Sequence, residues 1–209
     1  MNIPIAYEDD WLLVLDKPAG LLTIPTPKKE KRTLTSILND EAREKGLPYR
    51  LHPCHRLDRE TSGLIIYAKG KSIQEKMMRM FGQKGLQKTY IAFVRGNPAT
   101  PQGQISFPIE GKPAITRYRI IERIKDFSVA EVLPLTGRTN QIRIHFKRIG
   151  HPLLGETKFA FRRDFPVKAK RLCLHALRLE FKHPVSGSPV VIEAGLEKDL
   201  RDFLDRHPD

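Results

Sequence analysis

Asp58 stands between two arginines, Arg56 and Arg59, a few residues before the apolar run 64–68. A short apolar run of this kind predicts a buried strand, which would hold the preceding turn still at the rim of a sheet. The flanking positive charge favours the ionised carboxylate, so we expect the pKa of Asp58 to be lowered. An ionised aspartate suits a nucleophile or a base better than a general acid. For a single aspartate, a salt-bridged surface turn is the alternative.

Arg138 is a second candidate for chemistry. It follows Gly137 and precedes a predicted helix, 140–149, which Thr139 can cap and Gly150 can end. A guanidinium on such a tight turn can project as a fork of donors that suits a carboxylate. A cation near a helix N-terminus also lies at the unfavourable end of the helix dipole, so it needs a compensating partner. An ordinary surface arginine is the alternative.

The rest of the chain alternates between predicted helices and strands without an obvious repeat. Further helices are predicted over residues 33–45, 71–83 and 197–207, and strands over 11–15, 90–94, 115–124 and 127–133. Core candidates on the first two of these helices are Leu34, Ile37, Leu38, Met77, Met80 and Phe81. Strands separated by helices at unequal spacing favour an α+β fold over a regular parallel barrel.

The chain is strongly basic, because 37 Lys and Arg residues against 24 Asp and Glu residues give a net charge of +13. Such a surface attracts polyanions, and nucleic acid is the commonest of these in the cytoplasm. Charge alone does not separate RNA from DNA or from acidic lipid. The basic residues gather within 28–32, 143–148 and 162–171. Solvated loops and helix faces are the alternative interpretation of these groups.

The length and composition are those of one globular domain: 209 residues, 40% hydrophobic and 29% charged. Apolar runs stay well below the ~20 residues of a membrane span. The N-terminus lacks the basic start and apolar centre of a signal peptide. Two cysteines, Cys54 and Cys173, imply no disulfide framework. We therefore expect a cytoplasmic protein that does not bind membranes.

Four motifs, in order along the chain, resemble those of the RluA family of RNA pseudouridine synthases. Residues 55–70 (HRLDRETSGLIIYAKG) resemble the signature around the family's catalytic aspartate. Residues 88–96 resemble its KxYxAxVxG strand, and residues 136–145 with 150–155 resemble its TGRxHQIRxH…GHPxxGD block. Residues 172–184 resemble its LxLHAxxLxFxHP pattern. With DKPAG at 16–20, the resemblance covers most of the chain.

The resemblance implies the pseudouridine synthase fold, an α+β arrangement with a mixed, mostly antiparallel sheet, flanking helices and a basic catalytic cleft. We expect one catalytic domain over residues 1–209, without the N-terminal S4 RNA-binding domain that many relatives carry. The implied reaction isomerises uridine in ribosomal or transfer RNA: the C1′–N1 bond breaks, the uracil rotates and a C1′–C5 bond forms. This isomerisation requires no cofactor and no metal.

The resemblance gives Asp58 the catalytic role, with Arg138 pairing with it and Tyr90 lying against the target base. Asp58 either attacks C1′ or removes a sugar proton, and the sequence leaves both routes open. Stacking on Tyr90 is worth ~1–3 kcal/mol, which offsets much of the cost of flipping the base. Its hydroxyl can also help to remove the C5 proton, if its pKa lies well below ~10 or a relay reaches Asp58. A plain core tyrosine is the alternative.

Further residues are assigned around these three. The candidate RNA contacts, all cationic, are Arg56, Arg59, Lys88 and Arg143. Arg56 and Arg59 can bind phosphates or fill the gap that a flipped base leaves. Lys88, two residues before Tyr90, shares its face of the strand. The candidate apolar walls of the base pocket, which serve equally well as plain core residues, are Ile142 and Ile144.

Two positions depart from the family pattern. Asn140 stands where histidine is usual, and Glu156 where aspartate is usual. Asparagine keeps hydrogen-bonding capacity but cannot carry charge, so a proton-handling role at this position is in doubt. Several residues could suggest a metal site, but their spacing matches no familiar zinc pattern, so structural roles are expected. They are His52, Cys54, His55, Cys173 and His175.

The main rival hypothesis is a non-catalytic RNA-binding protein on the same fold, and a glycosylase is a weaker one. The presence of Asp58, Tyr90 and Arg138 favours the enzyme, because a degenerate site should have lost one of them. The sequence does not identify the uridine, nor does it choose between ribosomal and transfer RNA. RNA stem-loops are the expected partners, recognised by shape and exposed bases. We expect a monomer without an obligate protein partner.

Overall fold

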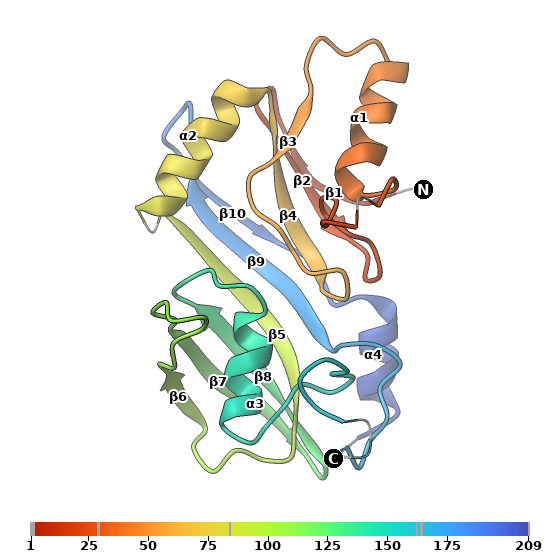
Figure 1. Ribbon diagram of the computed structural model, residues 1–209, viewed down its shortest axis with the longest axis vertical. Coiled ribbons are helices and arrows are strands. Elements are labelled where there is room, and N and C mark those ends of the chain that lie inside the picture. Colours follow the sequence, from red (N-terminus) through yellow and green to blue (C-terminus); the bar gives the residue numbers. More distant parts are fainter. Residues whose placement is uncertain (1–2, 29, 84, 162, 164, 209) are drawn as a thin grey trace. The chain divides into compact units, whose positions relative to one another are not determined.

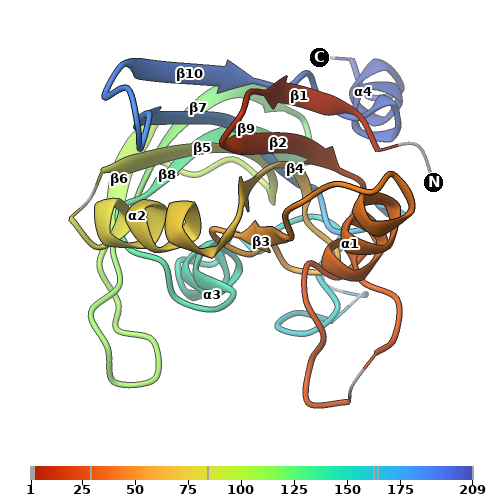
Figure 2. The same cartoon turned by 90° about the horizontal axis from the view of Figure 1, so that it is seen from above.

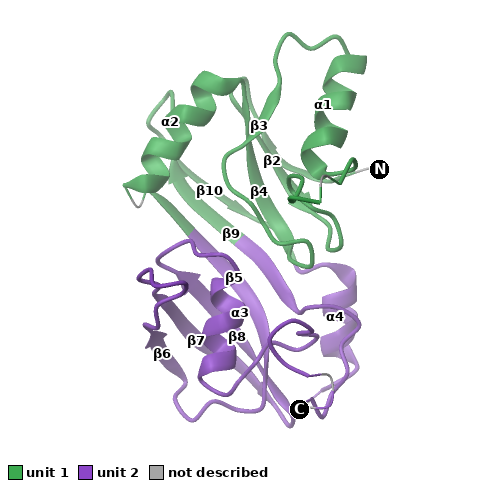
Figure 3. Cartoon of the chain, viewed as in Figure 1, with its two compact units in different colours: residues 1–87, 178–195 green, residues 88–177, 196–209 purple. Residues whose placement is uncertain are grey.

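The computed structural model describes residues 3–28, 30–83, 85–161, 163 and 165–208, and Figure 1 labels their helices and strands. The chain divides into two compact units, coloured separately in Figure 3. Unit 1 comprises residues 1–87 and 178–195, and unit 2 comprises residues 88–177 and 196–209. Strands β5 (Leu86–Arg95) and β9 (Leu174–Lys182) run from one unit into the other.

Unit 1 is built from short antiparallel strands and two helices. Besides the ends of β5 and β9, its elements are β1 (Ile5–Glu8), β2 (Leu12–Lys17), α1 (Leu34–Glu44), β3 (Leu51–Pro53), β4 (Ser62–Lys69), α2 (Lys71–Gly82) and β10 (Pro189–Glu193). β2 pairs with β1 on one side and β4 on the other. β3 also pairs with β4, and β10 pairs with β9. All these pairings are antiparallel.

The centre of unit 1 is β4, whose apolar run is buried as the sequence predicts. Leu64 and Ile66 point to one face and pack with Ile73 and Met77 of α2. Tyr67 points to the other face, where its buried hydroxyl bonds with the hydroxyl of Thr35 in α1 at 2.9 Å. Since β4 follows the Asp58 segment directly, this burial fixes the downstream end of that segment.

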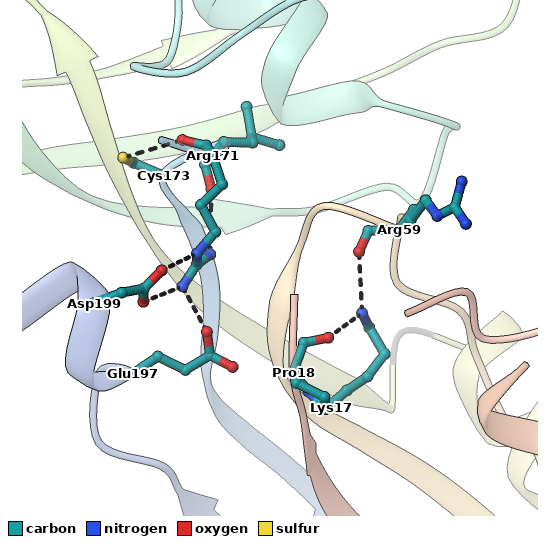
Figure 4. Close-up of polar contacts among 8 residues, drawn as sticks. Lys17, Pro18, Arg59, Arg171, Cys173, Glu197 and Asp199 are labelled. Atoms are coloured by element: carbon teal, nitrogen blue, oxygen red, sulfur yellow. Dashed lines mark hydrogen bonds and ion pairs between the residues drawn. The ribbon is translucent and has the colours of Figure 1, made fainter. Parts of the chain in front are cut away.

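Unit 2 holds an antiparallel sheet in the order β5-β8-β7-β6 and two helices. Besides β5 and the start of β9, its elements are β6 (Gln102–Ile105), β7 (Thr116–Ile124), β8 (Phe127–Pro134), α3 (Gln141–Arg148) and α4 (Lys198–Asp205). Arg171 ties the segment before β9 to the start of α4, since its guanidinium lies 2.6 Å from both Glu197 and Asp199 (Figure 4).

The two helices of unit 2 cover opposite faces of its sheet (Figure 2). Ile91 and Phe93 of β5 pack with Phe203 of α4 in an apolar cluster. The alternate face carries Tyr118, whose ring contacts Phe146 of α3 with centroids 5.4 Å apart. Residues on the two faces of one strand therefore meet different helices.

The predicted α+β class and the four predicted helices are confirmed. Met77 is buried as expected, while Met80 and Phe81 are partly buried against the same cluster. One detail was wrong: α3 begins at Gln141, and its N-cap is Asn140 in a left-handed conformation, so Thr139 does not cap it. The expectation of a single catalytic domain over residues 1–209 stays a prediction.

Candidate active site

Asp58 lies on a turn that ends just before β4, in unit 1. Its carbonyl oxygen accepts a hydrogen bond from the backbone N–H of Thr61 at 3.2 Å. Its neighbour Leu57 is buried, and Leu57 exchanges two bonds with Thr23: the Thr23 hydroxyl donates to the Leu57 carbonyl at 3.0 Å and accepts from its N–H at 3.2 Å. The backbone is therefore held on both sides of the Asp58 carboxylate.

A buried lysine supports the same turn from the end of β2. Lys17 is 0% exposed, and its ammonium donates to the carbonyls of Pro18 at 2.9 Å and Leu21 at 2.8 Å. A longer contact of 3.4 Å reaches the carbonyl of Arg59, next to Asp58 (Figure 4). The same carbonyl accepts from Gly20 N–H at 2.7 Å, and the Arg59 Nε returns a bond to the Gly20 carbonyl at 3.2 Å. Two segments far apart in sequence are thus joined at the candidate catalytic residue.

Lys88 and Tyr90 lie on β5 in unit 2 and share one face of its sheet, as predicted. Tyr90 pairs with Val132 of β8, which pairs in turn with Tyr118 of β7, so these side chains point the same way. Because Tyr118 contacts Phe146 of α3, Tyr90 lies on the α3 face. Tyr90 is 8% exposed, and burial lowers the pKa of the half-buried Lys88 to about 8. A lysine with that pKa is still mostly protonated at neutral pH, so it can bind a phosphate.

The turn that carries Arg138 is organised by Gln141, the first residue of α3. The Gln141 side-chain oxygen accepts from the N–H of Arg138 at 3.0 Å and from the hydroxyl of Thr136 at 2.7 Å. Its side-chain nitrogen donates to the carbonyl of Ile115 at 2.9 Å and to the hydroxyl of Thr116 at 3.0 Å. Gln141 is 4% exposed and joins the turn to the start of β7. One buried amide thus holds the backbone of Arg138.

His145 extends this network along α3. Its Nε2 lies 2.9 Å from the carbonyl of Phe107, an acceptor, so Nε2 carries the proton. Its Nδ1 lies 2.9 Å from the Thr116 hydroxyl and is therefore the acceptor there. Burial lowers the pKa of this histidine, and the bond to Phe107 offsets part of that effect. The lowered pKa favours the neutral form of His145 in this network.

The side chain of Arg138 is exposed, and its Nε donates to the carbonyl of Pro113 at 3.0 Å. That bond fixes the guanidinium through one of its three nitrogens. Within the described part of the chain, the terminal nitrogens Nη1 and Nη2 show no further hydrogen bond or ion pair. They remain able to donate to a carboxylate or a phosphate.

The side chain of Arg143 is buried in an ion pair, which the sequence did not predict. It was expected to contact RNA, but it is 5% exposed and forms a bidentate ion pair with Glu156, with both N–O distances at 2.7 Å. A third nitrogen donates to the side chain of Asn140 at 3.1 Å. These bonds give Arg143 a structural role, and a guanidinium enclosed in this way is poorly placed to bind a phosphate.

The remaining candidates divide by exposure. Arg56 and Arg59 are exposed, as phosphate contacts would need to be. Ile142 is 6% exposed and Ile144 is half-buried, so both positions suit a wall or a core. Asp58, Arg56 and Arg59 belong to unit 1, and the other candidate residues belong to unit 2.

Two important residues received no role from sequence reasoning. Lys17 continues the buried pattern of β2, and the signal in the sequence was a cation at the end of an apolar strand. Gln141 is a polar residue on the buried side of an amphipathic helix. Both sequence features are common in proteins, and neither reveals which atoms the side chain will bond to.

The comparisons with known proteins identify the family. Residues 11–148 match the family model described as RNA pseudouridylate synthase. That match covers more than half of the chain, so the chain belongs to the RNA pseudouridylate synthase family. The resemblance to the RluA branch is confirmed by the relatives.

Curated relatives match nearly the whole chain. The dual-specificity RNA pseudouridine synthase RluA of Escherichia coli strain K12 is 33% identical in an alignment 208 residues long, which covers 91% of this chain and 91% of RluA. The uncharacterized RNA pseudouridine synthase YlyB of Bacillus subtilis is 33% identical in an alignment 222 residues long, gaps included, which covers 98% of this chain and 73% of YlyB. The ribosomal large subunit pseudouridine synthase C of Yersinia pestis is 34% identical, and the match covers 96% of this chain and 68% of that protein.

Solved structures support the fold. Human RNA pseudouridylate synthase domain containing 4 aligns with a TM-score of 0.80 at 23% identity, covering 97% of this chain and 92% of that one. Human RNA pseudouridylate synthase domain containing 1 aligns with a TM-score of 0.77 at 25% identity, covering 93% and 84%. The α+β fold is therefore that of the pseudouridine synthases.

Within the described residues, every helix is too short or too polar to cross a membrane. The same residues hold no group of three or more His, Cys, Asp and Glu side chains arranged to bind a metal ion.

Proposed function

We propose that this member of the family converts uridine to pseudouridine in ribosomal or transfer RNA, with Asp58 as the catalytic carboxylate. The C1′–N1 bond breaks, the uracil turns, C5 bonds to C1′, and the proton lost from C5 is balanced by one gained at N1. The reaction is an isomerisation, so its atoms and electrons balance without a co-reactant. The observation that carries the proposal is that Asp58 lies in the matched family segment, on a turn held from both sides.

Asp58 acts on the ribose in either of two ways: its carboxylate attacks C1′, or it removes a sugar proton and so assists loss of the base. Both routes need an ionised carboxylate whose position does not drift. The bonds to Leu57, Arg59 and Thr61 support that requirement, because they fix the backbone at both neighbours. The choice between the routes does not affect the assignment of the residue.

Arg138 is the proposed guanidinium partner of the catalytic carboxylate, as the resemblance implies. Its Nε is used by Pro113, and its terminal nitrogens form the fork that a carboxylate accepts. Tyr90 is the proposed stacking partner of the base, and its hydroxyl is the proposed route for the C5 proton. Lys88, on the same face and with a pKa of about 8, is proposed to bind the RNA backbone beside it.

RNA is the partner of the family. Ribosomal RNA is proposed because one relative is named as a ribosomal large subunit enzyme, and transfer RNA because the resemblance to the RluA family implies it. Arg56 and Arg59 are the proposed phosphate contacts, since both are exposed. The net charge of +13 supports binding to a polyanion. We further propose a cytoplasmic monomer that needs no protein partner.

The test is tritium release from RNA labelled at uracil C5, taken from cells that lack this protein. Ribosomal and transfer RNA are assayed separately with wild type and with Asp58→Asn, which keeps the shape of the side chain. We expect release by the wild type alone, with salt-dependent RNA binding the same in both proteins. Binding without release from either RNA by the wild type would support the non-catalytic hypothesis instead.

A further inference from the structure

The turn that presents Arg138 requires an unusual backbone conformation at Asn140. The N–H of Gln141 donates to the Arg138 carbonyl at 3.2 Å, which closes a four-residue turn with Thr139 and Asn140 in its middle. Asn140 has φ 55° and ψ 24°, in the left-handed region. Glycine and asparagine are favoured at this third position of a turn, and most other side chains are strained there. Residue 140 therefore determines whether the Arg138 turn can close.

The side chain of Asn140 does not cap α3, although asparagine is a good capping residue. Its oxygen instead accepts a bond from Arg143 Nη1 at 3.1 Å, one turn further along the helix. Arg143 directs its other donors to Glu156, through Nε and Nη2 at 2.7 Å each. The guanidinium therefore connects the Arg138 turn to the segment after residue 155.

Glu156 is itself fixed, so it can serve as the anchor of this chain of contacts. It is 1% exposed, and its carboxylate also accepts from the N–H groups of Lys158 at 2.7 Å and Phe159 at 3.2 Å. The preceding Gly155 has φ 73°, and a Cβ there would lie 1.8 Å from the Arg171 carbonyl oxygen. The backbone beside Glu156 is therefore confined on both sides.

Both departures from the family pattern meet on the same guanidinium. Asparagine at 140 is shorter than the usual histidine, and glutamate at 156 is one methylene longer than the usual aspartate. Arg143 bonds to both residues, through Nη1 to Asn140 and through Nε and Nη2 to Glu156.

We propose that Asn140 is a positioning residue for Arg138: it closes the turn in the left-handed conformation and locks it, through Arg143, to Glu156. This inference rests on the proposed catalytic role of Arg138. It extends that role, because it explains how a residue on an exposed turn keeps a fixed direction. The proposal assigns a function to a position where the family's usual residue is absent.

The first test compares substitutions of Asn140 in the tritium-release assay, with the RNA that the wild type converts. Asn140→Ala loses both the left-handed preference and the bond to Arg143, and we expect kcat to fall about tenfold with KM for RNA unchanged. Asn140→Asp keeps both properties and should retain kcat within about twofold. Thr139→Ala, at the exposed neighbouring position of the same turn, is the matched control and should leave kcat unchanged.

The second test asks whether Asn140 acts through Arg138. In an Arg138→Ala background, adding Asn140→Ala should lower kcat no further, because the group to be positioned is gone. Thermal unfolding is also recorded for each variant, so that a loss of folded protein is not taken for a loss of kcat. An Asn140→Ala protein with wild-type kcat would overturn the proposal, as would an equal loss with and without Arg138, or a loss that Asn140→Asp fails to recover.

A failure of the proposed function gives a different result. If Arg138→Ala alone keeps full kcat, then the catalytic role of Arg138 is wrong and the positioning role falls with it. If Arg138→Ala is impaired but Asn140→Ala is not, the catalytic role stands and only the positioning role is rejected. The two single variants Arg138→Ala and Asn140→Ala therefore separate the two claims.

Discussion

The Asp58 turn and the Arg138 turn are both held by a buried side chain that bonds to backbone atoms, but the two supports have opposite character. Lys17 supports the Asp58 turn with a full positive charge and lies 42 residues from Arg59, the nearest residue that it contacts there. Gln141 supports the Arg138 turn with a neutral amide and lies three residues from it. One support is charged and long-range, and the other is neutral and local.

The difference follows from the charge that each turn carries. A cation in the support of the Asp58 turn is compatible with an ionised carboxylate, which the proposed chemistry needs. A neutral amide beside an arginine adds no carboxylate that would compete for the guanidinium, so Arg138 remains able to bind another anion. The separation in sequence between each supporting residue and its turn also matters. The Asp58 turn depends on β2 and the Asp58 segment being brought together by the fold, whereas the Arg138 turn is largely organised by α3.

The largest effect is expected from removing the charged support. Lys17→Met keeps most of the side-chain volume but leaves the carbonyls of Pro18 and Leu21 without their donor. We expect the free energy of unfolding to fall by about 2 kcal/mol, since partly buried carbonyls lose their partner. Turnover should fall as well, because the Asp58 turn loosens. Urea unfolding and tritium release measure the two effects.

Lys71→Met is the matched control, because Lys71 is an exposed lysine at the start of α2 in the same unit. Its unfolding free energy should change by less than about 0.5 kcal/mol. Equal stabilities for the two methionine variants would show that the Lys17 ammonium contributes little, and the contrast between the two turns would then lose its basis.

A smaller effect is expected from removing the neutral support. Gln141→Leu leaves the N–H of Arg138 and the carbonyl of Ile115 without the amide, at a cost of about 2 kcal/mol in unfolding free energy. Because the amide organises the Arg138 turn and not the Asp58 turn, kcat should fall more than RNA affinity. Filter binding and tritium release on the same preparation separate the two quantities. A loss of affinity with unchanged kcat would contradict this assignment.

The sequence predicts the local half of this comparison better than the long-range half. A glycine, an arginine and an amphipathic run indicate the Arg138 turn and α3, because turn and helix signals lie within a few residues of each other. The apolar run after Asp58 correctly predicts β4. The contact of Lys17 with the Arg59 carbonyl, next to Asp58, was not predictable, since residue spacing along a chain does not reveal which distant backbone atoms a buried cation will meet.

Arg143 shows a second thing that the sequence could not predict, namely which basic residues are exposed. In a basic sequence, an arginine on a helix is reasonably assigned to RNA, because most arginines are exposed. The structure buries it against Glu156, thirteen residues away, and no helical or strand period connects these two positions. Composition predicts that a basic surface exists, but it does not predict which of the basic residues belong to it.

Acidification should lower the free energy of unfolding through His145, which belongs to the hydrogen-bond network around the Arg138 turn. Burial lowers the pKa of His145 from its usual 6.5, so the unfolded chain binds a proton more readily than the folded one. Stability from the neutral ring is full above pH 6.5 and is lost as pH falls below that value towards the lower folded pKa. We expect the unfolding free energy to fall by up to about 1 kcal/mol between pH 7 and pH 5.5 for this residue.

The measurement is urea unfolding at several pH values for the wild type and His145→Gln. The variant should show a shallower decline on acidification, even if it is less stable at every pH. His52 in unit 1 also has a lowered pKa, chiefly from burial and then from Arg50 and Lys71, so some decline remains. Identical slopes for wild type and variant would remove His145 from the pH dependence.

The smallest structural effects are expected from the two exposed arginines beside Asp58, which differ in one contact. Among the described residues, Arg56 makes no hydrogen bond or ion pair with the turn, whereas Arg59 donates through Nε to the Gly20 carbonyl. Arg56→Ala should therefore reduce the salt dependence of RNA binding by about one unit of slope and leave kcat unchanged. Arg59→Ala should do the same and also lower kcat, because the turn loses a bond. If both variants change affinity and kcat alike, the bond to Gly20 does not distinguish them, and the Asp58 turn is held by Lys17 and Thr23 without help from its own arginine.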